Sequence, residues 1–208
     1  MVISDSLRML FVHVQKTGGS TTDRWLTDTV PDVRRIGSLD RHAPLRQILA
    51  AEPELADYWI FGAVRNPWER LLSWHRMVLR WLENVPDGVR VEDHPRFARN
   101  GFLLTVATEM VDFEHFVMDG PERFGRLRRP QVAYLGDQGR TVDFTARQER
   151  LDDDLAAVAE RFGLTPPDGR PRNVDRERPD YRDHYTPAMR DRVAELYAAD
   201  LKAFGYTF

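Results

Sequence analysis

The sequence contains no cysteine and almost no lysine. Without cysteine, the chain forms no disulfide bond, offers no thiolate to a metal and has no thiol nucleophile. Lysine and arginine together number 30, yet only Lys16 and Lys202 are lysines. A compact ammonium and a planar guanidinium differ in chemistry, so a lysine at position 16 of an arginine-rich chain needs an explanation. The heavy use of arginine and alanine suggests a GC-rich bacterial source.

The chain also lacks a strong net charge, a long apolar run and a metal-binding pattern. A formal net charge of −3 gives no sign of a chain-wide nucleic-acid surface, so any anion site must be local. No run approaches the ~20 apolar residues of a membrane span, and residues 1–8 do not resemble a secretory signal. The spacing of His, Asp and Glu fits no metal site. We therefore expect a cytoplasmic protein with no membrane span, metal or nucleic-acid partner.

Two apolar runs, residues 9–14 and 58–64, have the composition of buried strands, and each is followed by a turn and a helical pattern. Repeated strand–loop–helix units predict an α/β fold with a central, mostly parallel sheet flanked by helices. A length of 208 residues predicts a single domain over residues 1–208. The other predicted elements are strands at 33–36, 132–135 and 141–145, helices at 20–30, 43–51, 67–84, 112–118, 151–162 and 187–204, and loops at 86–101 and 164–182.

The segment Q-K-T-G-G-S-T-T, residues 15–22, lies between the first predicted strand and the first predicted helix. A helix N-terminus presents unpaired amides and a positive dipole end, and glycine lets an anion approach the backbone. Hydroxyls and the ammonium of Lys16 complete a phosphate cradle. The common nucleotide loop, G-x-x-x-x-G-K-[ST], is absent, since this lysine precedes the glycines. The alternative interpretation is a tight turn with an incidental lysine.

The second predicted strand leads into the helix at 67–84 through the segment V-R-N-P-W-E-R-L-L-S, residues 64–73. Arg65 lies at the carboxyl end of that strand, the edge at which open α/β sheets bind ligands, and a guanidinium grips phosphate with two hydrogen bonds. Ser73 follows about two helical turns later and reaches the same ligand only if strand end and helix converge. Taken singly, a capping arginine and a surface serine are the simpler interpretations.

Together, the two segments resemble sulfotransferases that use 3′-phosphoadenosine 5′-phosphosulfate (PAPS). The shared pattern is strand–x-K-T-G-G-[ST]–helix followed by strand–V-R-N-P-[WY]-x-R-L-x-S, and the likeness is greatest to the carbohydrate-type and bacterial branch. Residues 142–151 resemble the family's strand ending in R-x-E-x-L, and residues 181–208 resemble its closing helix and F-G-Y-x-F tail. Gln15 departs from the family, in which proline is common at that position.

The resemblance implies a P-loop-like nucleotide-binding sulfotransferase fold and a role for each matching residue. Arg65 and Ser73 would hold the 3′-phosphate of PAPS, and Lys16 would also stabilise the leaving phosphate. The residues implied for the 5′-phosphosulfate are Lys16, Thr17, Gly18, Gly19, Ser20 and Thr21.

A general base must also activate the acceptor hydroxyl or amine. Related sulfotransferases carry a histidine in a segment comparable to residues 39–45, so the resemblance implies His42 as catalytic base. A helix-entry histidine bonded to backbone is the alternative. We expect His13 to be a core histidine, and His75 to be able to border the cleft. The remaining candidates are surface histidines, His94, His115 and His184, and two carboxylates, Glu69 and Glu149.

The sequence thus predicts a sulfotransferase that moves a sulfuryl group from PAPS to a small-molecule or carbohydrate acceptor without a metal. Two alternatives remain open. An ATP-dependent phosphotransferase would need a magnesium-binding hydroxyl and carboxylate in the usual loop context, which we do not find. A non-catalytic nucleotide-binding module would keep the cleft and lack turnover.

Overall fold

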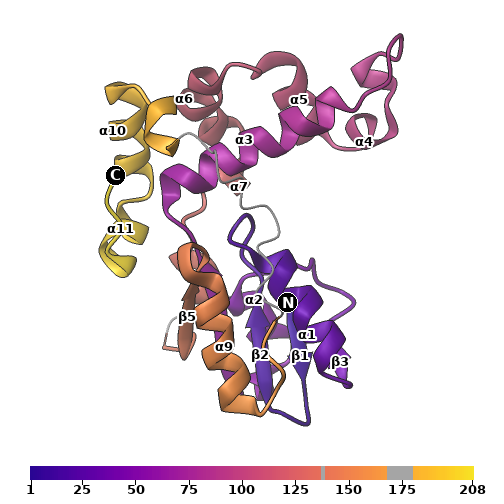
Figure 1. Cartoon of the computed structure of the whole chain (residues 1–208), viewed down its shortest axis with the longest axis vertical. Coiled ribbons are helices and arrows are strands. Elements are labelled where there is room, and N and C mark those ends of the chain that lie inside the picture. Colours follow the sequence, from indigo (N-terminus) through magenta and orange to yellow (C-terminus); the bar gives the residue numbers. More distant parts are fainter. Residues whose placement is uncertain (137–138, 168–179) are drawn as a thin grey trace. The chain divides into compact units, whose positions relative to one another are not determined.

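The computed structural model describes residues 1–136, 139–167 and 180–208. The chain divides into two compact units, which we describe separately (Figure 1). The first comprises Met1–Arg65 and Gln131–Arg176, and the second comprises Asn66–Pro130 and Glu177–Phe208. A single domain over residues 1–208 remains a prediction beside this division.

The first unit is built on a sheet with strand order β3-β1-β2-β4-β5. β2 pairs in parallel with β4, and β4 with β5, whereas β1 is antiparallel to both β2 and β3. Among the described strands only β1 therefore runs against the rest, and the predicted mostly parallel sheet is confirmed. The strands are β1 (Val2–Ser4), β2 (Met9–Val12), β3 (Val33–Arg34), β4 (Trp59–Val64) and β5 (Phe144–Arg147).

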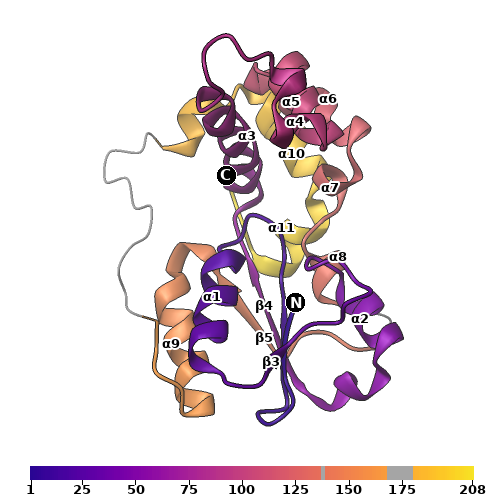
Figure 2. The same cartoon turned by 90° about the vertical axis from the view of Figure 1, so that its right-hand side faces the viewer.

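Helices cover both faces of this sheet, as Figure 2 shows. On one face lie α1 (Gly19–Thr29) and α9 (Leu151–Phe162), and on the other lie α2 (Leu45–Ala51) and α8 (Val132–Leu135). Burial on both faces is why β2 and β4 read as continuous apolar runs. The core against α1 and α9 contains Val2, Met9, Phe11, Trp25, Leu26, Val30, Phe61, Leu155, Val158 and Ala159.

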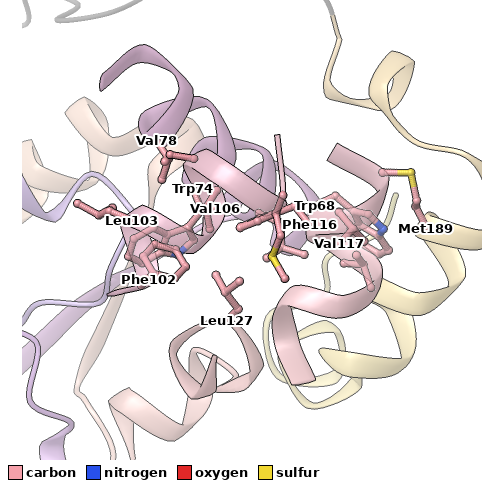
Figure 3. Close-up of a cluster of buried hydrophobic side chains, with 14 of the residues drawn as sticks. Trp68, Trp74, Val78, Phe102, Leu103, Val106, Phe116, Val117, Leu127 and Met189 are labelled. Carbon is pink, nitrogen blue, oxygen red and sulfur yellow. The ribbon is translucent and has the colours of Figure 1, made fainter. Parts of the chain in front are cut away.

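The second unit is helical in its described part. Its longest helix, α3 (Pro67–Glu83), starts where sequence reasoning placed it, because Asn66 accepts a hydrogen bond from the Trp68 amide at 3.0 Å and Pro67 occupies the first turn. Trp68, Trp74 and Val78 face a core shared with the other helices (Figure 3). Those helices are α4 (Pro95–Ala98), α5 (Gly101–Glu109), α6 (Phe113–Arg123), α7 (Gly125–Arg128), α10 (Pro187–Leu196) and α11 (Ala198–Phe204).

The C-terminal tail packs against the start of α3 within the same unit. The Phe208 ring lies 5.4 Å from that of Trp68 and contacts two tyrosines, Tyr181 and Tyr185, at 5.7 and 5.8 Å. The Asn66 side-chain amide donates to the Thr207 carbonyl at 3.0 Å. Asn66 therefore caps α3 with one side-chain atom and holds the tail with another.

Several predicted elements are wrong or shifted. Residues 132–135 form helix α8 rather than a strand, because a four-residue apolar run fits either element and here Leu135 packs on Gly62 of the sheet. The strand expected at 141–145 starts later, at Phe144. Helix 187–204 breaks at Tyr197, whose buried hydroxyl donates to the Leu127 carbonyl. Strand β1, helix α5 and the short helices within residues 86–101 were not predicted. Residues 168–179 of the predicted loop lie outside the described residues.

Within the ranges described above, no helix combines the length and the apolar character needed to cross a bilayer.

Candidate active site

The loop from β2 to α1 adopts an unusual backbone conformation. Lys16 has a φ of 68° and Gly18 has a φ of 82°. Both values lie in the left-handed backbone region, which residues other than glycine rarely adopt. The Thr17 hydroxyl donates to the Val14 carbonyl at 3.0 Å and so fixes the turn. The left-handed backbone conformation of a lysine costs about 1 kcal/mol or more of folding free energy, and such strain concentrates at functional sites.

Helix α1 begins at Gly19, and no side chain caps its first turn. The Thr21 amide donates to the Gly18 carbonyl at 2.9 Å. The amides of Gly19 and Ser20 precede the first intrahelical hydrogen bonds, and no described backbone carbonyl accepts from them. Two donors and the positive end of the helix dipole thus remain available at the end of β2.

Close packing requires glycine at position 19, and a φ of 82° favours glycine at position 18. A Cβ on Gly19 would lie 2.1 Å from Cδ2 of His13, and a Cβ on Gly18 would lie 2.5 Å from Cδ2 of Leu151. The loop is therefore held between the His13 ring on one side and the start of α9 on the other.

We expect Gly19→Ala to destabilise the protein by about 1–3 kcal/mol, because the added methyl overlaps the His13 ring. For a chain of this size the melting temperature should fall by roughly 2–4 °C per kcal/mol. The matched control is Gly37→Ala, since a Cβ there meets nothing within 4 Å. Equal melting temperatures for the two variants would contradict the packing described for the loop.

His42 is half-buried and held by the loop. Its Nδ1 lies 3.0 Å from the His13 carbonyl, and its backbone amide donates to Oδ1 of Asp40 at 2.7 Å. A carbonyl only accepts, so Nδ1 carries the proton and Nε2 carries the lone pair. Burial lowers the pKa of His42 below its ordinary value, which keeps the imidazole neutral at neutral pH. A neutral imidazole whose Nε2 carries no proton has the chemistry of a general base.

The rings of His13 and His42 pack edge to face, with their centroids 4.4 Å apart. His13 is only 2% exposed, in agreement with the expectation of a core histidine, and burial lowers its pKa strongly. Its Nδ1 lies 3.3 Å from the Arg41 guanidinium, which can only donate, so the His13 proton belongs on Nε2. Asp23 of α1 completes the cluster, 3.7 Å from both Arg41 and His13.

Because His13 and His42 are held in the folded protein in their neutral form, the free energy of unfolding depends on pH. The pKa of each is depressed in the folded protein, so the unfolded chain binds more protons once the pH falls below the ordinary histidine value of about 6.5. Stability should be fully present above that value and decline as the pH is lowered. We expect the melting temperature of the wild type to fall more between pH 7 and pH 5 than that of His13→Gln. Parallel pH curves for the two proteins would contradict this.

Arg65 directly follows β4. Because β2 and β4 are parallel, it lies at the same end of the sheet as the carboxyl end of β2. Its backbone is held by Gln131, whose side chain bonds both the amide and the carbonyl of Arg65, at 2.9 and 2.8 Å. Ser73 lies half-buried on α3 in the second unit. The structure thus places His42 against His13, whose ring lies beside Gly19 of the loop, and holds the Arg65 backbone through Gln131.

The other histidines have structural roles or lie at the surface. His75, expected to be able to border the cleft, is only 4% exposed, and its Nε2 lies 3.1 Å from the Met110 carbonyl. His94 accepts from the Arg96 amide at 3.3 Å and so caps α4. His115 is exposed beside Asp119.

Sequence reasoning missed Gln131, Arg41 and Asp23. Only the adjacency of Arg41 to His42 offered a signal, because the other two reach the site through contacts that are distant along the chain.

The model of a sulfotransferase family matches residues 1–207, nearly the whole chain. The chain belongs to the sulfotransferase family. Comparison with curated proteins gives no match.

Family membership makes this sulfotransferase a transferase of sulfuryl groups that takes a sulfate donor as co-substrate. The loop after β2, with its lysine and its two first-turn amides, has the donors that a sulfate or phosphate ester needs. No group of three or more His, Asp and Glu side chains in the described residues is arranged to hold a metal ion.

Proposed function

We propose that the protein transfers a sulfuryl group from PAPS to a hydroxyl or amine of a small-molecule or carbohydrate acceptor. The observation that carries the proposal is the left-handed Lys16 loop, which leaves the Gly19 and Ser20 amides at the carboxyl end of β2. That edge of the sheet also carries Arg65. Anions bind at such helix N-termini, and open α/β sheets bind nucleotides at the carboxyl ends of their strands.

The donor-binding roles follow from the family resemblance, and those of Arg65 and of the loop after β2 fit the contacts of the first unit. Lys16, Gly18, Gly19, Ser20 and Thr21 would bind the 5′-phosphosulfate, and Ser20 and Thr21 are exposed residues. The Thr17 hydroxyl already donates to Val14, so Thr17 would contribute its backbone amide. Arg65 and Ser73 would recognise the 3′-phosphate, and the planar guanidinium of Arg65 would donate two parallel hydrogen bonds to it.

In the proposed reaction, a bond forms between the acceptor oxygen or nitrogen and sulfur as the bond between sulfur and the bridging oxygen breaks. Lys16 stabilises the negative charge that develops on the departing phosphate. His42 takes the acceptor proton at Nε2, while its Nδ1 proton stays bonded to the His13 carbonyl. The neutral His13 packs against the ring of His42, and Arg41 in turn contacts His13 Nδ1, so both would help to keep the orientation of the base.

The test is transfer of labelled sulfate from PAPS to a panel of acceptors in the presence of a metal chelator. A phenol (4-nitrophenol), a chito-oligosaccharide and an aminoglycoside cover aromatic hydroxyls, sugar hydroxyls and amines. We expect labelled product from at least one class, unchanged by the chelator. Transfer of labelled phosphate from ATP that requires magnesium, with no sulfate transfer, would overturn the proposal in favour of a phosphotransferase.

A further inference from the structure

Gln131 forms two hydrogen bonds to the backbone of one residue, Arg65. Its Oε1 accepts from the Arg65 amide at 2.9 Å, and its Nε2 donates to the Arg65 carbonyl at 2.8 Å. The Gln131 residue is 0% exposed. We propose that Gln131 is a positioning residue that sets Arg65 for recognition of the 3′-phosphate. This inference rests on the proposed function, in which Arg65 binds that phosphate.

The direction of the Arg65 backbone follows from the hydrogen bonds of β4. The Trp59 amide donates to the Arg8 carbonyl, toward β2, whereas the Ile60 carbonyl accepts from the Asp143 amide, toward β5. Amide and carbonyl of one residue point to the same side of a strand, and the side alternates along it. Six residues after Trp59, Arg65 therefore presents its backbone groups toward β2.

At the level of Arg65, however, β2 has already ended. The last paired residues of the two strands are Val12 and Gly62, and the chain beyond Val12 turns into the Lys16 loop. Without a neighbour, the Arg65 amide and carbonyl would lack ladder partners. The Gln131 side chain takes the position of the missing strand, since a carboxamide offers the same donor and acceptor as a peptide group.

The backbone of Gln131 is itself fixed to the sheet. Helix α8 begins at the next residue, and its Leu135 packs so closely on β4 that a Cβ on Gly62 would lie 2.3 Å from Leu135 Cδ2. The main chain of Arg65 is thus held by a residue that directly precedes a helix packed on the same strand. Fixing the Cα of an arginine reduces the freedom lost when its guanidinium grips a phosphate with two hydrogen bonds.

This arrangement predicts a selective effect on affinity. Replacing a residue that positions Arg65 should weaken the binding of nucleotides that carry a 3′-phosphate and leave the binding of nucleotides without it nearly unchanged. Replacing a residue needed only for folding would weaken the binding of both kinds of nucleotide equally. Two nucleotides separate these cases: 3′-phosphoadenosine 5′-phosphate (PAP) carries the phosphate, and adenosine 5′-phosphosulfate lacks it.

The experiment measures the dissociation constants of both nucleotides by calorimetry for the full chain with Gln131→Glu, Gln131→Met and the control Gln47→Glu. Gln47 is exposed on α2. At pH 8 the carboxylate of Gln131→Glu cannot donate to the Arg65 carbonyl, so we expect PAP affinity to fall about tenfold or more. As the pH is lowered the carboxyl takes up a proton, regains the donor and recovers affinity relative to the control. Gln131→Met introduces no charge and should bind PAP weakly at every pH.

The outcomes separate the inference from the function on which it rests. Wild-type PAP affinity in both Gln131 variants would overturn the inference and leave the proposed function intact. Equal losses for PAP and adenosine 5′-phosphosulfate would also overturn it, since they indicate a general loss of structure. If the unchanged protein binds no PAP, the proposed function itself fails. A selective loss of PAP affinity with recovery at low pH supports both.

Discussion

Replacing Lys16 with alanine should lower kcat for sulfuryl transfer by about 10²–10³-fold while the protein remains folded. Removal of one fixed donor aimed at developing charge costs that much in comparable sites. The left-handed loop holds Lys16 immediately before Thr17, Gly18 and the unpaired first-turn amides. Steady-state transfer from PAPS to the best acceptor of the panel measures the effect. The matched control is Lys202→Ala, which removes the other lysine of the chain, an exposed residue of α11.

A second variant at the same position separates catalysis from stability. Lys16→Gly should raise the melting temperature by a few degrees, because glycine adopts φ of 68° without strain worth about 1 kcal/mol. The same variant should be as inactive as Lys16→Ala. Activity near the wild-type level in either variant would contradict the role proposed for the ammonium.

Replacing His42 with glutamine should lower kcat by about 10²–10⁴-fold, the usual contribution of a general base. A glutamine amide can still donate to the His13 carbonyl, so the local fold is preserved and only the base is lost. Transfer assays on the wild type should show a rate that is constant near neutral pH and falls on the acid side, below the ordinary histidine pKa, because burial lowers the pKa of His42. The residual rate of His42→Gln should not show this decline.

The control for this experiment is His115→Gln, which changes an exposed histidine of α6 and should leave both rate and pH profile unchanged. Wild-type turnover by His42→Gln would remove His42 from the mechanism. Attention would then pass to the carboxylates Glu69 and Glu149.

The parts of the fold that could be predicted carry strong local signals. An apolar run followed by Lys-Thr-Gly-Gly marks β2 and the start of α1, and Asn66-Pro67 marks the start of α3. These signals act through turn chemistry and capping, which depend on neighbours in the chain. Both segments were therefore identified, together with the edge of the sheet at which Arg65 lies.

What could not be predicted depends on contacts between distant residues. A four-residue apolar run at 132–135 does not distinguish helix from strand, and its contact with Gly62 decides the matter. Nothing near Gln131 in the sequence indicates that its side chain completes a ladder at Arg65. The left-handed Lys16 was equally hidden, since local preference disfavours it and only the packed loop sustains it.

The measurement that tests the account most directly is a thermal-shift titration of the wild type with PAP, run beside ADP and ATP–magnesium. A ligand present at 100 times its Kd stabilises the folded state by roughly 2.7 kcal/mol, which corresponds to about 5–10 °C here. We expect PAP to raise the melting temperature and Arg65→Ala to abolish the shift, with ADP and ATP–magnesium giving little effect. A shift produced by ATP–magnesium and not by PAP would contradict the proposal that PAPS is the donor.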